Sequence, residues 1–162
     1  MAHDNWGTPL DFFRVVNEEF HFDLDAAATG QDTLCERFIS PEQDALITPW
    51  DGAAVWCNPP YGAGSAAGHA LPDFIARGHQ QSFERRNTVV MLIPAYTDPK
   101  YWANSVMHAH EVRFLKGRLK FRDNLGTATM SARFPSVLVV FKTIAGKTHG
   151  KAPNQFVWDW RV

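Results

Sequence analysis

Short apolar runs without polar alternation are the feature of this chain that most restricts its fold. Residues 88–93 read Thr-Val-Val-Met-Leu-Ile, and residues 137–141 read Val-Leu-Val-Val-Phe. A strand with one buried face alternates apolar and polar residues, so these runs predict strands covered on both faces. Other segments, such as residues 10–20, carry apolar residues at helical spacing. Strands alternating with helices favour an α/β fold with a mostly parallel central sheet and helices on both faces.

The remaining elements are predicted from the same patterns. Helices are expected over residues 8–20, within 32–38, over 71–79 and over 98–108, and strands over 21–25, 53–57, 111–115 and 117–122. Thr8 is expected as the N-cap of the first helix with Pro9 at its first position, and Asp98 as the cap of the last helix. The chain has 162 residues, so we expect residues 1–162 to form a single domain.

Several function classes are excluded by what the chain lacks. No apolar run approaches the roughly 20 residues that cross a bilayer, and the first residues do not resemble a signal peptide. Cys35 and Cys57 are not spaced as a redox pair, and we interpret both as reduced, structural thiols. The seven histidines are scattered, and none has a metal-site spacing. We therefore expect a cytoplasmic protein without a metal ion or a membrane partner.

The net charge of −1 conceals an asymmetry along the chain. Residues 1–60 carry a formal charge of −9, whereas residues 61–162 carry +8. This division is consistent with one surface for a cationic ligand and another for a polyanion. The alternative is that the fold interleaves the two halves and the charges average out.

The tetrapeptide Asn58-Pro59-Pro60-Tyr61 follows directly after the apolar run 53–57. Two successive prolines stiffen this loop and remove two N–H groups, so it offers acceptors, including the side-chain oxygen of Asn58. A nucleobase amino group is a poor nucleophile because its lone pair is delocalised, and two acceptors on its N–H bonds favour the pyramidal form that reacts. Tyr61 can stack on an extruded base. The loop predicts a base-binding site at the carboxyl end of a strand, and a simple proline-stiffened turn is the alternative.

Several motifs together resemble those of a known family. In sequence order they are Trp6-Gly7-Thr8-Pro9, Phe22 to Ala28, Asp44-Ala45-Leu46, Trp50, Trp56 to Tyr61, Leu92-Ile93-Pro94, Gly117 to Phe121 and Pro135-Ser136. On these motifs the chain resembles the phage-type DNA adenine-N-6 methyltransferases, a Dam-like family that uses S-adenosylmethionine. The resemblance implies a Rossmann-like methyltransferase fold and, for a phage-encoded protein, a location in the host cytoplasm.

The resemblance also implies roles for individual residues. The catalytic target-base pocket would consist of Asn58, Pro59, Pro60 and Tyr61. The cofactor would be bound by Trp6, Thr8, Pro9, Asp25, Ala26, Ala27 and Asp44. Of these, Asp25 would receive the amino group of the methionine moiety, and Thr8 would present helix N–H groups to its carboxylate. Asp44 would bind the ribose hydroxyls if it follows a second strand, and a capping or solvated acid is its alternative.

Two of these assignments have specific qualifications. The Gly-x-Gly turn common in the wider superfamily is absent, and residues 25–30, Asp-Ala-Ala-Ala-Thr-Gly, stand in its place. The small side chains of Ala26 and Ala27 would still permit close approach of a ligand. Trp6 would pack over the cofactor or line the base pocket, unless it belongs to the core.

A basic segment over residues 113–122 is the candidate for DNA contact. On a strand over 117–122, Arg118, Lys120 and Arg122 would share one face and the apolar residues between them the other. Together with Lys116 they would contact DNA phosphates, and the alternative is an ordinary edge strand with solvated charges.

Our hypothesis from the sequence is therefore a site-specific, adenine-specific DNA methyltransferase. It would transfer a methyl group from S-adenosylmethionine to the N-6 amino group of adenine in double-stranded DNA. Two alternatives stay open at this point: a cytosine N-4 DNA methyltransferase, and a non-catalytic DNA-binding protein that retains the fold.

Overall fold

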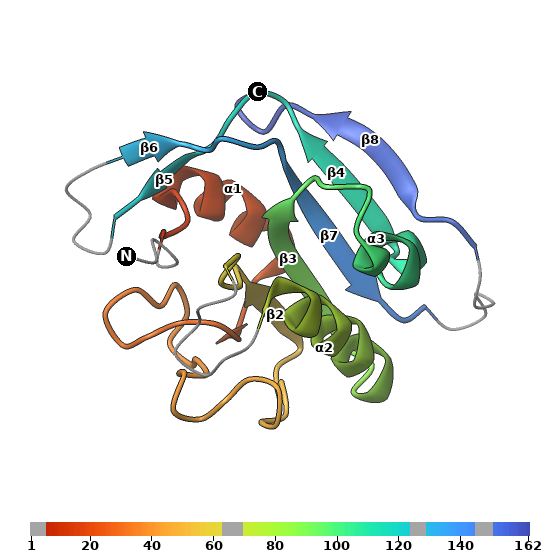
Figure 1. Cartoon of the computed structure of the whole chain (residues 1–162). Helices are drawn as coiled ribbons and strands as arrows, with labels where there is room; N and C mark the ends of the chain where they lie inside the picture. The colour runs from red at the N-terminus through yellow and green to blue at the C-terminus, as the bar shows by residue number, and fades with distance from the viewer. Residues whose placement is uncertain (1–5, 63–69, 124–128, 145–150) are drawn as a thin grey trace.

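The centre of the molecule is a six-stranded sheet (Figure 1). The computed structural model describes residues 6–62, 70–123, 129–144 and 151–162. In spatial order the strands are β1 (Leu24–Asp25), β2 (Ala54–Cys57), β3 (Thr88–Pro94), β7 (Ser136–Lys142), β4 (Glu111–Leu115) and β8 (Asn154–Trp158). β7 is antiparallel to both of its neighbours, and all the other pairings are parallel. The expected mostly parallel sheet is confirmed.

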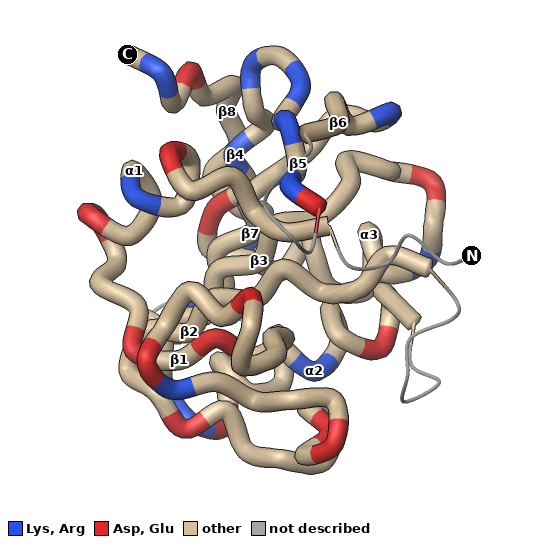
Figure 2. The backbone as a smooth tube through the Cα atoms, turned by 90° about the vertical axis from the view of Figure 1, so that its left-hand side faces the viewer, with Lys and Arg blue, Asp and Glu red and all other residues tan. Residues whose placement is uncertain are grey.

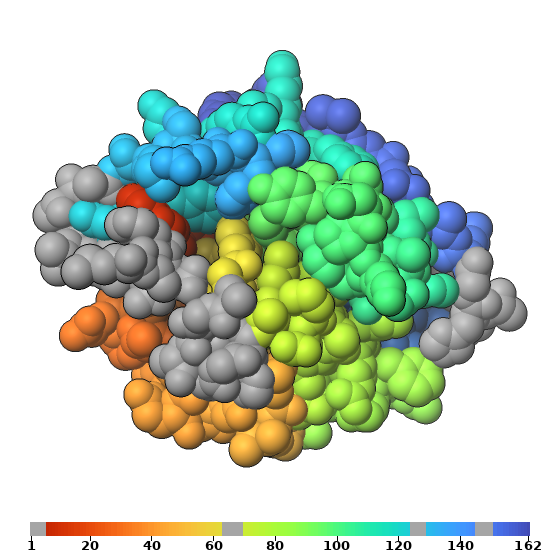
Figure 3. All heavy atoms as spheres, in the orientation of Figure 1, coloured from red at the N-terminus to blue at the C-terminus, as the bar shows by residue number. Residues whose placement is uncertain are grey.

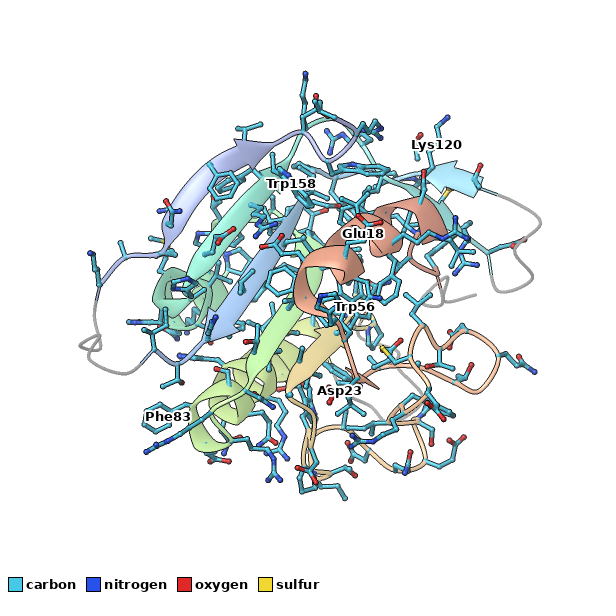
Figure 4. The ribbon with its side chains drawn as sticks, turned by 180° about the vertical axis from the view of Figure 1, so that it is seen from behind. Glu18, Asp23, Trp56, Phe83, Lys120 and Trp158 are labelled. Carbon is cyan, nitrogen blue, oxygen red and sulfur yellow. The ribbon has the colours of Figure 1, made fainter. Side chains whose placement is uncertain are left out.

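Helices cover both faces of this sheet, which explains why its central strands have no polar alternation. α1 (Leu10–Phe20) packs on one face, where Phe12, Phe13 and Val16 join Trp56 and alternate residues of β3 and β7 in one core cluster. Figure 4 shows α1 lying across the sheet with Trp56 beneath it. α2 (Leu71–Glu84), α3 (Lys100–Asn104) and the 3-10 helix η1 (Val106–His108) pack on the other face. In the part of the chain that the structure describes, no helix is long and apolar enough to cross a membrane.

A small hairpin lies apart from the main sheet. β5 (Lys120–Arg122) and β6 (Thr129–Ser131) are antiparallel and form a two-stranded sheet of their own. An isolated bridge between Gly7 and Arg122 attaches the segment before α1 to this hairpin. The hairpin therefore lies beside the beginning of the described chain rather than on an open edge of the main sheet.

A buried arginine ties α1 to the edge of the main sheet. Arg113 of β4 has only 6% of its surface exposed, and its guanidinium donates to both carboxylate oxygens of Glu19 at 2.7 and 2.6 Å. It also forms an ion pair with Glu111. The guanidinium carbon lies 4.9 Å from the ring centroid of Trp158, so β8 contributes a cation–π contact.

The predicted helix within residues 32–38 is wrong. These residues form turns, because side chains there bind the local backbone instead of solvent. The Asp32 carboxylate accepts from the N–H of Thr29 at 2.6 Å, and the Thr33 hydroxyl donates to the carbonyl of Cys35 at 2.8 Å. The predicted strand over 21–25 is reduced to Leu24–Asp25, and a single parallel bridge from Asp25 to Phe38 continues the sheet beyond it.

Three further elements differ from expectation. The helix predicted over 98–108 is divided into α3 and η1 and begins after Pro99, so Asp98 is not its N-cap. The strand predicted over 117–122 begins only at Lys120, because Gly117 has a φ of 77° in the left-handed region. β8 was not predicted, since its residues are mostly exposed and lack an apolar run.

Candidate active site

The carboxyl ends of β1 and β2 place two of the predicted site segments next to each other. Asp25 pairs with Trp56 in parallel register, so Asp25 and the loop that begins at Asn58 leave the sheet at the same edge. Asn58, Pro60 and Tyr61 are partly exposed, whereas Pro59 is buried. In Figure 3 the yellow atoms of this loop reach the molecular surface below the light blue residues of the β6 region. The loop is therefore accessible to a ligand and is not sealed in the interior.

The side-chain amide of Asn58 is held at both ends. Its nitrogen donates to the backbone oxygen of Trp6 at 3.3 Å and to the hydroxyl oxygen of Thr8 at 3.2 Å. Its oxygen lies 2.9 Å from the hydroxyl of Tyr61. Because a backbone carbonyl can only accept, the Trp6 contact requires the nitrogen, not the oxygen, on that side. The amide oxygen accordingly faces the other way, on the Tyr61 side.

The Tyr61 hydroxyl has two acceptors and one proton. It lies 2.9 Å from the Asn58 side-chain oxygen and 2.9 Å from the backbone oxygen of Leu92. Burial raises the pKa of this hydroxyl well above its usual value, so it stays protonated. The ring meets Phe134 and Phe121 edge to face, with centroids 5.5 and 6.3 Å away. The single hydroxyl proton is shared between these two acceptors. Because an amide oxygen has two lone pairs, the Asn58 oxygen can accept a further hydrogen bond from a ligand N–H.

Asp25 is a buried carboxylate at the end of β1. Its side chain accepts from the N–H of Ala27 at 3.3 Å and from that of Leu34 at 3.2 Å. Only 3% of the residue is exposed, and burial raises its pKa to about 6 although both N–H bonds act to lower it. Among the described residues it has no cationic partner. A buried carboxyl group of this kind would gain from a cation supplied by a ligand.

A small cavity lies beside this end of the sheet. It has a volume of about 130 Å³ and is lined by Gly7, Leu10, residues 31–34, Arg122 and Asp123. Its walls thus carry one guanidinium, two carboxylates and residues from the beginning of α1. Groups of both signs in one cavity suit a ligand that is itself zwitterionic.

The segment before α1 differs from the prediction. The helix begins at Leu10 with Pro9 as its N-cap, which has no side-chain acceptor, and the Asp11 carboxylate accepts from the N–H of Phe12 in the first turn at 2.9 Å. Thr8 is therefore not the N-cap. Its hydroxyl instead accepts from Asn58, and the residue is 2% exposed. Trp6 is partly buried and packs against the same core cluster as α1.

Comparison with known proteins identifies the family. The sequence matches the profile described as DNA N-6-adenine-methyltransferase (Dam) over residues 1–153. It is 34% identical over 158 residues to the DNA N-6-adenine-methyltransferase of Haemophilus phage HP1 (strain HP1c1), covering 95% of this chain and 86% of that protein. The chain belongs to the Dam family of DNA N-6-adenine-methyltransferases.

Two more distant matches accompany this Dam-family assignment. The DNA N-6-adenine-methyltransferase of Escherichia phage T1 is 29% identical over 120 residues, which are 73% of this chain and 47% of that protein. The chain thus spans about half the length of the T1 protein. A solved structure from Listeria monocytogenes, assigned to the class I S-adenosylmethionine-dependent methyltransferases, has 15% identity, a TM-score of 0.43, and coverage of 75% of this chain and 41% of that chain. So weak a likeness carries no argument, and the strand order itself defines the α/β fold of the Dam-family chain.

Of the other predicted cofactor residues in the Dam-family chain, the two alanines follow β1 and Asp44 lies in a turn. Ala26 is completely buried in the core, which leaves the partly exposed Ala27 as the alanine able to meet a ligand. Asp44 lies in a turn with a φ of 56°, and its carboxylate accepts from the N–H of Leu46 at 2.9 Å. The expected second strand before Asp44 is only the one-residue bridge at Phe38.

The hairpin confirms part of the amphipathic pattern. Leu119 and Phe121 are 1% and 4% exposed, while Lys116, Arg118 and Lys120 are exposed. Figure 4 shows Lys120 extending away from the molecule. In Figure 2 the blue Lys and Arg positions gather around β5, β6 and the C-terminus, whereas red Asp and Glu positions are frequent in the loops that precede β2. The bases around the hairpin and the acids of the loops before β2 thus lie in different parts of the fold, although the Glu19–Arg113 and Asp51–Arg85 ion pairs join the two halves of the sequence.

Arg122 is bound by the segment that precedes α1. Its backbone exchanges two hydrogen bonds with Gly7, at 2.8 and 2.9 Å, and its side-chain Nε donates to the backbone oxygen of Thr8 at 2.9 Å. The guanidinium therefore lies along residues 7–8. Arg118, for its part, precedes the strand. The prediction that Arg122 contacts DNA together with its neighbours stays a prediction.

Both cysteines of the Dam-family chain are free thiols with raised pKa values. Cys57 is fully buried and burial raises its pKa well above the usual value, and burial raises the pKa of Cys35 to about 12. Within the described residues, no three His, Cys, Asp or Glu side chains gather as ligands for a metal ion.

Proposed function

We propose that this chain methylates the N-6 amino group of adenine in double-stranded DNA, using the loop 58–61 to hold an extruded base. The observation that carries the proposal is the Asn58 amide, locked by Trp6 and Thr8 so that its oxygen, not its nitrogen, faces the Tyr61 side of an accessible loop. A carbonyl oxygen so fixed is an acceptor for an amino N–H. Membership of the Dam family supports the choice of adenine.

Catalysis follows from positioning and from acceptors that strengthen during the reaction. Bound S-adenosylmethionine supplies an electrophilic methyl group on a sulfonium. The Asn58 oxygen and a backbone oxygen of the proline pair hold the two amino N–H bonds, which favours the pyramidal nitrogen. These contacts become stronger as the nitrogen becomes tetrahedral and cationic, so they lower the barrier rather than merely bind the substrate.

The residues at the ends of β1 and β2 fit the proposed cofactor. Asp25 is a buried carboxylate without a cation in the described residues, and it would hold the ammonium of the methionine moiety. The N–H groups at the beginning of α1, after Trp6, Thr8 and Pro9, would face its carboxylate. Ala27 leaves room for the cofactor, and Asp44 would bind the ribose hydroxyls.

DNA would lie against the basic hairpin. Arg118 and Lys120 are exposed, and Lys116 is exposed although it pairs with Asp159 at 2.9 Å. Contacts from these side chains to phosphates would position the duplex without reading its sequence. The catalytic loop and the hairpin are close enough for Tyr61 to touch Phe121, so one duplex could meet both. Residues 1–162 would act as one methyltransferase domain.

The decisive test compares Asn58→Ala with wild type. Loss of one preorganised polar group at a reacting centre typically costs about 10²–10³ in turnover. We expect a loss of this size in N-6-methyladenine formation, measured by nucleoside analysis of DNA incubated with S-adenosylmethionine. Cofactor affinity, measured by calorimetry, should change little. Asn154→Ala is the matched control, because Asn154 is exposed at the opposite end of the sheet.

Three results would contradict the proposal in different ways. Equal turnover in wild type and Asn58→Ala would remove Asn58 from the mechanism. Appearance of N-4-methylcytosine would identify the wrong base. Failure of the wild-type protein to bind S-adenosylmethionine would indicate a non-catalytic DNA-binding protein.

A further inference from the structure

We propose that Thr8 is a positioning residue that fixes the amide plane of Asn58 for reaction with adenine. The inference rests on the proposed function, because it concerns the same loop. It extends that function by giving Thr8 a task other than cofactor binding. The Thr8 hydroxyl oxygen accepts from the Asn58 side-chain nitrogen at 3.2 Å, and Thr8 is 2% exposed.

The orientation of Asn58 matters because its amide has two ends of nearly equal shape. Rotation by 180° would exchange the oxygen for the nitrogen and would point N–H groups at the N–H groups of adenine. The Asn58 nitrogen carries two N–H bonds, and the structure gives each one an acceptor, Trp6 O and Thr8 Oγ1. Two acceptors define a plane as well as a direction. With Trp6 alone, the amide could still tilt about the remaining hydrogen bond.

The Thr8 hydroxyl does not cap α1. It was expected to do so, but the helix begins at Leu10, and the first-turn N–H of Phe12 is bound by the Asp11 carboxylate instead. Its hydroxyl is buried, and the hydrogen bond from Asn58 is the one that the structure gives it. A buried hydroxyl retained at a reactive loop, rather than an apolar side chain of the same shape, is consistent with a task in orienting Asn58.

Thr8 is itself held in place by the hairpin. Gly7 and Arg122 exchange two backbone hydrogen bonds, and Arg122 Nε donates to Thr8 O at 2.9 Å. A continuous series of hydrogen bonds therefore runs from Arg122 through Thr8 to Asn58. This arrangement gives Arg122 a positioning task as well.

Thr8→Val tests the inference because valine keeps the shape of threonine and removes the hydroxyl. We expect kcat for adenine methylation to fall about ten- to a hundred-fold, while KM for DNA and the calorimetric Kd for S-adenosylmethionine change less than twofold. Thr8→Ser restores the hydroxyl and should recover kcat to within about threefold. Thermal unfolding of each variant verifies that the protein is folded under assay conditions.

Arg122→Met provides a second, independent variant. It should lower kcat and leave the salt dependence of DNA binding unchanged, because a side chain that binds Thr8 releases no counterion from DNA. Lys120→Ala, at an exposed residue proposed to contact phosphate, should by contrast reduce the salt dependence of DNA binding. Fluorescence anisotropy at several salt concentrations measures this dependence.

The inference is overturned if Thr8→Val keeps wild-type kcat. It is also overturned if the Kd for S-adenosylmethionine rises as much as kcat falls, because Thr8 would then act on the cofactor. If Thr8→Ser is as slow as Thr8→Val, the hydroxyl is not the relevant group. Each of these outcomes leaves the proposed function intact as long as wild type forms N-6-methyladenine and Asn58→Ala forms it about 10²–10³ times more slowly.

Discussion

Asp25→Asn should stabilise the ligand-free protein at high pH while it weakens cofactor binding. Burial raises the pKa of Asp25 from 3.8 to about 6. A carboxyl group whose pKa is raised by folding contributes stability that is fully present below the unfolded pKa and is lost as the pH rises through the folded pKa. The relevant window therefore lies between about pH 4 and pH 6, and above it the ionised group opposes folding.

The magnitude follows from the size of the shift. A shift of about 2 pKa units corresponds to about 3 kcal/mol of folding free energy that wild type loses between low and high pH. Asparagine removes the charge but places an NH₂ group against one of the two N–H donors, Ala27 or Leu34, at a cost of about 1–2 kcal/mol. At pH 8 the variant should thus be about 1–2 kcal/mol more stable than wild type. Below pH 4 it should be the less stable protein.

Urea unfolding of both proteins between pH 4 and pH 8 measures this crossover. Asp23→Asn is the matched control, because Asp23 also accepts from two backbone N–H groups, those of Ala53 and Ala54, but is exposed. It loses similar hydrogen bonds without removing a buried charge, so it should be destabilised at pH 8. A variant Asp25→Asn that is less stable than wild type at every pH would refute the reasoning.

Cofactor binding tests the same carboxylate from the ligand side. An ammonium placed beside Asp25 would lower its pKa, so binding near pH 6 should release a proton. Affinity for S-adenosylmethionine should accordingly fall as the pH drops below about 6, and calorimetry in two buffers of different ionisation enthalpy counts the proton. Asp25→Asn should bind more weakly and show no such pH dependence. Equal affinity at pH 5 and pH 7 in wild type would place the ammonium elsewhere.

Three further predictions concern other parts of the molecule. Arg118→Ala and Lys120→Ala should each lower the slope of log K against log salt for DNA binding by about one, and unchanged slopes would exclude phosphate contacts. Tyr61→Ala should reduce the fluorescence change of 2-aminopurine at the target position, whereas Tyr61→Phe, which keeps the ring, should retain most of it. Arg113→Met should leave Glu19 and Glu111 without their buried partner and cost about 3 kcal/mol in urea unfolding, and a loss below 1 kcal/mol would contradict this.

The parts of the fold that were predictable are those in which local pattern and burial agree. β3 and β7 were recognised because both of their faces are covered, which removes every polar residue from the run. The direction of β7 was not predictable from that pattern. It follows the hairpin β5–β6 instead of a covering helix, and so it enters the sheet antiparallel to β3. Apolar character indicates where a strand is buried, but the length and path of the connection decide which way it runs.

The helix predicted within residues 32–38 does not form, because hydrogen bonds from side chains outweigh the local sequence pattern there. Its residues have adequate helical spacing, but Asp32 and Thr33 have short polar side chains that bind the backbone of Thr29 and Cys35. The buried Asp25 then takes the N–H of Leu34, which adds a tertiary contact to the local ones. Propensity is a weak prior wherever a buried acceptor competes for the same N–H groups.

In the active site, too, the features set by adjacent residues could be predicted, and the contacts between distant residues could not. The loop 58–61 could be recognised because its stiffness and its acceptors come from adjacent residues. The group that orients it could not, since Thr8 and Asn58 are 50 positions apart and meet only after the segment before α1 has joined the hairpin. Arg122 makes a contact that its charge does not reveal: a strand end that gains a backbone partner at Gly7 also brings its side chain toward Thr8. If kcat depends on the hydrogen bonds that join Arg122, Thr8 and Asn58, substitutions at Arg122 should lower activity even when every residue of the loop 58–61 is intact. The sequence of the loop alone does not predict such an effect.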